Sequence, residues 1–192
     1  MADFNLKTID GEYSNTDVFD RTLGYIFKLN NPHKYYMGVY PATLDGAIAS
    51  FAQTYDINHL RSSDQKVWHM VLSADCHDCR SRNSHRSCNH CGKMRNLFCF
   101  SDCFANLLCS KYQLCYALHD NEEGLHFHFV ISTTSYQFCG VPLSMEILKT
   151  VYLPQLRQII RSSGYSFYFI PPTQGGALCS MNTMTSLSLI HI

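Results

Sequence analysis

Residues 116–132 read YALHDNEEGLHFHFVIS, with a mainly apolar stretch on each side of a polar turn. Successive side chains of a strand point to opposite faces, so His126 and His128 share one face, while the apolar residues between and after them share the other. The acidic, glycine-containing segment 120–124 is typical of a tight turn. We therefore predict two antiparallel strands, over residues 113–118 and 126–133.

Histidines make this hairpin a candidate metal site. His119 lies just before the turn, so in a closed hairpin it comes beside His126 or His128. Three converging imidazoles that leave coordination positions open are typical of a catalytic metal, because the free positions accept a phosphate oxygen. A His-x-His pair alone is more often an incidental polar pair on a surface. The third histidine and the acidic turn favour metal binding here.

The rest of the chain alternates irregularly between helical and strand patterns. We predict strands at 5–9, 66–73 and 165–170, and helices at 17–29, 44–55, 98–110 and 145–162. Because the clearest strands are joined by a tight turn, the sequence favours an α+β fold with a central, mainly antiparallel sheet flanked by helices.

Length and composition indicate one globular domain. The chain has 192 residues, of which 46% are hydrophobic, enough for one sizeable core. Fifteen Lys and Arg balance fifteen Asp and Glu, which argues against nucleic-acid binding through overall positive charge, although a local basic patch would suffice. No leader-like pattern and no apolar run of about 18 residues is present, so we expect a cytoplasmic protein without a membrane span.

A cysteine-rich insert interrupts the pattern at residues 75–97. Two Cys-x-x-Cys pairs, Cys76 with Cys79 and Cys88 with Cys91, can supply four thiolates to a structural Zn ion. The alternative is four reduced cysteines in a loop. An excess of basic residues in the insert is suited to DNA phosphates, or is simply solvated. These residues are Arg80, Arg82, Arg86, Lys93 and Arg95.

The segment from His119 to His128 resembles the third motif of the plasmid mobilisation relaxases, which are His-hydrophobic-His (HUH) endonucleases. In that family a first histidine precedes the His-hydrophobic-His pair by seven residues, and all three histidines bind Mg or Mn. The spacing of His119, His126 and His128 matches this pattern. The chain departs from it at Asn121 and Ser132, where the family often has Asp and Asn.

Two upstream segments also resemble relaxase motifs. DRTLGY at residues 20–25, followed by NPHK at residues 31–34, resembles the first motif and implies that Tyr25 is the catalytic nucleophile. WHMVLS at residues 68–73 resembles the second motif and implies a role for His69 at the DNA 3′ side or in support of the site. The resemblance predicts a nuclease domain over residues 1–170, followed by a tail over 171–192.

The resemblance implies a metal-dependent nickase of single-stranded DNA that forms a covalent 5′-phosphotyrosine intermediate. Such an enzyme would act at an origin-like site, with or without accessory DNA-binding proteins, in the mobilisation or replication of a mobile element. A phenol has a pKa of about 10 and needs a polarised phosphate before it attacks, which the metal would provide.

Other assignments remain open from the sequence. Tyr35, Tyr36 and Tyr40 compete with Tyr25 for the role of nucleophile. Tyr152, on the helix after the His pair, would serve in a rolling-circle replication initiator or a transposase. A third reading is non-enzymatic: a zinc-stabilised DNA-binding protein whose His cluster is vestigial or structural.

Overall fold

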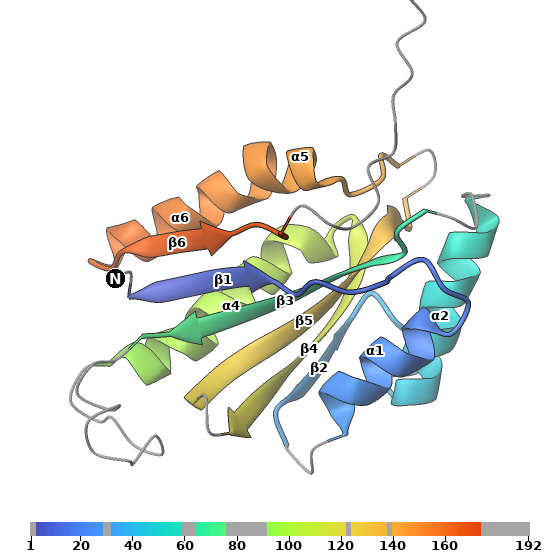
Figure 1. The fold of residues 1–192 in the computed structure, drawn as a ribbon, viewed down its shortest axis with the longest axis horizontal. Coiled ribbons are helices and arrows are strands. Elements are labelled where there is room, and N and C mark those ends of the chain that lie inside the picture. Colours follow the sequence, from blue (N-terminus) through green and yellow to red (C-terminus); the bar gives the residue numbers. More distant parts are fainter. Residues whose placement is uncertain are drawn as a thin grey trace, which may run out of the picture.

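Six strands form a single sheet in the order β2-β4-β5-β3-β1-β6. Our computed structural model describes residues 3–28, 32–58, 64–75, 92–121, 124–137 and 140–173. All neighbouring strands run antiparallel except β1 and β6, which are parallel (Figure 1). The strands are β1 (Phe4–Thr8), β2 (Lys34–Met37), β3 (Val67–Ala74), β4 (Tyr112–Asn121), β5 (Gly124–Ser135) and β6 (Phe167–Ile170).

Helices lie on both faces of this sheet. They are α1 (Val18–Phe27), α2 (Leu44–Ile57), α4 (Lys93–Cys109), α5 (Met145–Ile147) and α6 (Leu153–Ser162), with a π-helical turn, η1 (Leu148–Tyr152), between the last two. The predicted α+β class with a mainly antiparallel sheet is confirmed. No helix among the described residues combines the length and apolar character needed to cross a bilayer.

The larger core lies between the sheet and the helices α4 and α6. Phe129 of β5 is fully buried there, stacked on Tyr116 of β4 with ring centroids 5.2 Å apart and edge-on to Phe104 of α4. Apolar residues at alternate positions of β4 and β5 build this core, as the hairpin pattern predicts. The residues between them therefore point to the opposite face.

That opposite face carries a second core, which covers only part of the sheet. Helices α1 and α2 pack there on β4, β5 and the start of β3, around buried residues such as Phe51 and Val130. No residue of β1 or β6 belongs to this core, within the parts of the chain that the structure describes. On this side, Asn5, Lys7 and Ile170 instead line an open cavity.

One predicted boundary moves. Helix α4 begins at Lys93, after Gly92 in a left-handed conformation (φ +64°), so Lys93 and Arg95 lie in its first turns and not in the insert loop. Lys93 is paired with Asp3 (2.6 Å) and donates to the backbone carbonyl of Asp75. The insert cysteines and Arg80, Arg82 and Arg86 lie outside the described residues, as does the tail beyond residue 173.

Candidate metal centre and active site

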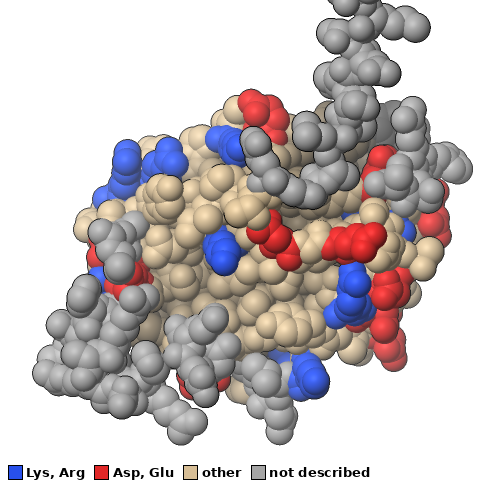
Figure 2. All heavy atoms as spheres, viewed as in Figure 1, with Lys and Arg blue, Asp and Glu red and all other residues tan. Residues whose placement is uncertain are grey.

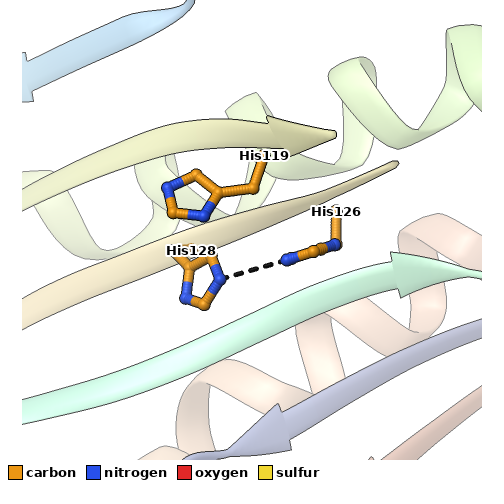
Figure 3. A group of neighbouring side chains, drawn as sticks. All are labelled: His119, His126 and His128. Carbon is orange, nitrogen blue, oxygen red and sulfur yellow. Dashed lines mark hydrogen bonds between the residues drawn. The ribbon is translucent and has the colours of Figure 1, made fainter. Parts of the chain in front are cut away.

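The β4–β5 hairpin brings three imidazoles together. His119 and His126 are directly opposite in the register, and His128 lies opposite Ala117. All three side chains point to the face that α1 covers, and each is at most 5% exposed. They come from two neighbouring strands and point into one common space (Figure 3). The predicted convergence of the three histidines is therefore present.

Backbone carbonyls orient two of the rings. The Nε2–H of His119 donates to the carbonyl oxygen of Ile26 in α1 (2.9 Å), and the Nδ1–H of His126 donates to that of Gly124 (2.8 Å). A carbonyl can only accept, so each contact fixes which nitrogen of the ring carries the proton. His119 then has its lone pair on Nδ1 and His126 on Nε2.

These three residues fit a divalent cation. One nitrogen of each ring can be chosen such that all three lie within 4.8 Å of one another. The Nε2 atoms of His126 and His128 are 3.1 Å apart, and the rings of His119 and His128 have centroids only 4.2 Å apart. Ligand histidines commonly donate their second nitrogen to a carbonyl or a similar acceptor, as His119 and His126 do here.

Burial keeps the imidazoles of His119 and His128 neutral. It lowers the pKa of His128 to about 2, assisted by the neighbouring His69, His119 and His126, and it also lowers the pKa of His119. A neutral ring has a lone pair available for a metal ion, whereas a protonated ring does not. At pH 7 these two rings can therefore act as ligands without first losing a proton.

His69 is a fourth imidazole at the edge of the cluster. It projects from β3, two residues before Val71, which lies opposite His128. Its Nε2 is 2.8 Å from Nδ1 of His128, and its Nδ1 is 3.1 Å from the hydroxyl oxygen of Tyr13. Burial, together with nearby His119, lowers its pKa to about 4. Both ring nitrogens are thus already engaged.

Tyr25 of α1 lies over the histidines. Its ring centroid is 5.4 Å from that of His128, 5.7 Å from His119 and 5.8 Å from His69. The side chain is half-exposed, at 51%, so its hydroxyl can meet a substrate. Helix α1 places it there because Leu23 and Ile26 bury the opposite side of the helix in the second core.

Two cavities meet at Tyr25. The larger, of about 580 Å³, extends from Tyr25 and the histidines across the open half of the sheet. It is lined by Asn5, Lys7, Ile9, Tyr25, His69, Val71, Ser73, His126, His128 and Ile170. The smaller, of about 280 Å³, is lined by Gly11, Glu12, Tyr13, Arg21, Thr22, Tyr25 and His69. Tyr25 and His69 border both.

One comparison with known proteins found a matching family. The sequence model of the family described as Relaxase: MobA/VirD2-like, nuclease domain matches residues 25–146, more than half of the chain. The chain belongs to this relaxase family. The matched range contains Tyr25, His69 and the three hairpin histidines. No curated protein and no solved structure matches the chain.

Membership of the relaxase family places the chain among the DNA endonucleases. Relaxase nuclease domains nick DNA and generally use a divalent metal, which agrees with a histidine cluster able to hold one. The six-stranded sheet with helices on both faces fits the fold expected of this relaxase.

The tyrosines that compete with Tyr25 have other surroundings. Tyr152 is 5% exposed and packs against Tyr112, at the end of β4 opposite the hairpin turn. Tyr35 stacks on Tyr116 in the larger core, Tyr36 lies against Phe27, and Tyr40 is 89% exposed. Among the described aromatic contacts, none of these four rings touches the histidine cluster.

Sequence reasoning missed one member of the site. Tyr13 contacts His69 and lines the smaller cavity, but it lies in a segment without regular structure and outside every recognised motif. Its neighbours Gly11 and Glu12 give no periodic signal. The carbonyl groups of Ile26 and Gly124 were equally hidden, because any residue type supplies a carbonyl.

Proposed function

We propose that this domain nicks single-stranded DNA with Tyr25 as nucleophile and a divalent cation, Mg or Mn, on His119, His126 and His128. The observation that carries this proposal is the position of Tyr25, half-exposed and with its ring centroid 5.7 Å from that of His119 and 5.4 Å from that of His128. A phosphate held at the cluster would lie beside the phenol. Such proximity removes much of the entropic cost of attack.

The residues of the chain divide the chemistry between them. A bound cation would supply Lewis-acid polarisation of the phosphate oxygens. Neutral imidazoles at His119 and His128 add no charge of their own to that group. The Tyr25 oxygen attacks phosphorus and forms a bond to the 5′-phosphate, while the bond from phosphorus to the 3′-oxygen breaks. Overall, the phenol proton is transferred to the departing 3′-oxygen. The product is a 5′-phosphotyrosine and a free 3′-hydroxyl.

The larger cavity offers a path for the DNA strand. It leads from Tyr25 across β3, β1 and β6, where none of the side chains of Asn5, Lys7 and Ser73 is buried. Lys7 is exposed and can pair with a phosphate, and Tyr168 of β6 is 58% exposed and can stack on a base. We propose that single-stranded DNA follows this half of the sheet.

The test uses a randomised pool of single-stranded oligonucleotides carrying a label at the 3′ end. Incubation with Mn²⁺ is expected to transfer the label to the protein, because the 3′ part of the strand stays on the tyrosine. Tyr25→Phe should lose the adduct. Tyr40→Phe, which removes a hydroxyl from an exposed tyrosine, should keep it.

Other outcomes favour the other readings. An adduct that persists in Tyr25→Phe and disappears in Tyr152→Phe favours a replication initiator or transposase. If oligonucleotides bind but no adduct forms, and each chain contains one Zn ion, the non-catalytic DNA-binding reading is favoured. Zinc binding by Cys76, Cys79, Cys88 and Cys91, DNA contacts by the basic insert, and accessory proteins remain proposals of the same kind.

A further inference from the structure

Tyr13 and His69 extend the histidine cluster by two hydrogen bonds that the proposed cleavage does not use. The chain of contacts runs from the Tyr13 hydroxyl to Nδ1 of His69 (3.1 Å), and from Nε2 of His69 to Nδ1 of His128 (2.8 Å). It ends at Nε2 of His128, 3.1 Å from Nε2 of His126. One end of the chain lies at the smaller cavity and the other at the candidate metal centre.

In this series of hydrogen bonds, only two arrangements of the ring protons satisfy both contacts of His69. The reason is that each neutral imidazole has one N–H and one lone pair. Without a cation, Nε2–H of His128 donates to the lone pair on Nε2 of His126. Nδ1 of His128 then accepts from Nε2–H of His69. Nδ1 of His69 in turn accepts from the Tyr13 hydroxyl, and every group is paired.

With a cation held by the cluster, this order would reverse. Binding through Nε2 of His128 requires a lone pair there, so the proton of this ring lies on Nδ1 and is donated to Nε2 of His69. The proton of His69 then lies on Nδ1 and is donated to the Tyr13 oxygen. No proton is gained or lost: two rings exchange tautomers, and the Tyr13 O–H bond rotates away from His69.

We infer that His69 and Tyr13 are positioning residues that hold His128 in its metal-binding tautomer, and that metal binding turns the Tyr13 hydroxyl into a donor toward the smaller cavity. This inference rests on the metal centre proposed above. The cavity also contains Arg21 beside Tyr25, and the acceptor that suits both donors is a phosphate oxygen of the DNA strand next to the nick. Metal and DNA then bind cooperatively.

The first experiment measures tautomers directly. Protein labelled with ¹⁵N at histidine is recorded by NMR without metal and with saturating Mg²⁺, a diamagnetic probe. We expect the proton of His69 to move from Nε2 to Nδ1 when Mg²⁺ is added. The same His69 tautomer in both states would overturn the inference, because a merely structural histidine has no reason to change.

The second experiment measures the affinity for Mn²⁺ by calorimetry. His69→Phe removes the acceptor for His128 and should weaken binding by about 10- to 100-fold, the usual loss for such a partner. His69→Gln keeps an acceptor oxygen and should recover most of the affinity. Tyr40→Phe, on an exposed side chain away from the cluster, should bind as the wild type does.

The controls separate this inference from the metal centre. Melting curves in EDTA show whether His69→Phe still folds, and His69→Gln keeps the test decisive if it does not. Wild-type affinity in both His69 variants, with binding lost in His126→Ala, would overturn the inference and leave the metal centre standing. A wild-type chain that binds no Mn²⁺ would overturn both.

The coupling to DNA has its own measurement. In a Tyr25→Phe background, where no cleavage is expected, the affinity for an oligothymidylate strand is compared with and without Mn²⁺. Mn²⁺ should increase it, and the additional Tyr13→Phe change should remove most of that increase. An equal increase with and without the Tyr13 hydroxyl would overturn the role of Tyr13.

Discussion

His126 offers a metal the lone pair of its Nε2, because its Nδ1–H is already bound to the carbonyl of Gly124. A ligand that binds only the folded state stabilises it by RT ln(1 + [L]/Kd), about 2.7 kcal/mol at 100 times Kd. Mn²⁺ should therefore raise the melting temperature of the wild type. In His126→Ala, which lacks one of three ligands, most of that increase should be lost.

His33→Ala is the matched control for this melting experiment. His33 lies against Phe98 of α4 and not in the cluster, so its loss should leave the Mn²⁺-induced increase unchanged. An increase of the same size in His126→Ala and the wild type would show that the stabilising ion binds elsewhere.

Lys7 borders the larger cavity, on the exposed side of β1. If the DNA strand follows this half of the sheet, Lys7→Ala removes one phosphate contact. The salt dependence of single-strand affinity, log K against log[salt], should then become shallower by about 0.7. Fluorescence anisotropy with a labelled oligonucleotide at several salt concentrations measures this slope.

Lys149→Ala is the comparison for Lys7→Ala. Lys149 is also exposed, but it lies in η1, which packs on the other face of the sheet. It should keep the wild-type slope. Equal effects of the two substitutions would mean that DNA affinity depends on the overall charge of the protein and not on contacts along the larger cavity.

For single residues, the sequence predicts contacts that follow from regular spacing along the chain. It does not predict contacts between residues that only the fold brings together. The interval between His119 and His126 and the alternation along β5 were enough to predict the cluster. The contact between Tyr13 and His69 joins residues 56 positions apart, and neither belongs to a periodic pattern with the other. No local rule could have paired them.

Helices and strands, too, are predicted where their sequence pattern is periodic and missed where it is not. Strand β2 has four residues, all half-buried, and lies at the edge of the sheet against β4, so it lacks the alternation that reveals a strand. The predicted helix 145–162 contains a π-helical turn just before Pro154. Proline has no N–H for the usual helical bond, and a wider turn accommodates that loss.

Asp3 joins three elements near the start of β1. Its carboxylate pairs with Lys93 of α4 (2.6 Å) and accepts from the backbone N–H and the hydroxyl of Ser166, just before β6. These contacts hold the pKa of Asp3 well below its usual value of 3.8, with the Lys93 contact the largest cause. The carboxylate therefore stabilises the fold above about pH 4, and that contribution is lost as the pH falls below it.

Asp3→Asn should thus lower the free energy of unfolding at pH 7 by up to about 1 kcal/mol, as for other exposed ion pairs. The difference from wild type should shrink as the pH falls below 4. Urea unfolding at a series of pH values measures it. Asp56→Asn, which removes a charge from an exposed position of α2, should show a smaller difference at pH 7. A constant deficit of Asp3→Asn at every pH would contradict this account.

Over the whole chain, charge is balanced. The formal net charge is zero, and the face that carries α1 and the open half of the sheet shows basic and acidic groups scattered over a largely uncharged surface (Figure 2). General attraction to the DNA backbone is therefore weak. The proposed specificity rests instead on the cavity, the cluster and Tyr25, which a single sheet holds in place.

That sheet also links the two cores, and we expect them to unfold as one cooperative unit. Phe129 and Val130 are consecutive residues of β5, both fully buried, one in the core under α4 and the other in the core under α1 and α2. Phe129→Ala should cost about 3–5 kcal/mol and Val130→Ala less, because a smaller cavity is left. Since β5 belongs to both cores, each substitution should lower the midpoint of one and the same unfolding transition, followed by circular dichroism and by tryptophan fluorescence. Two separate transitions, each sensitive to only one substitution, would show that the α1–α2 layer carrying Tyr25 unfolds independently of the rest.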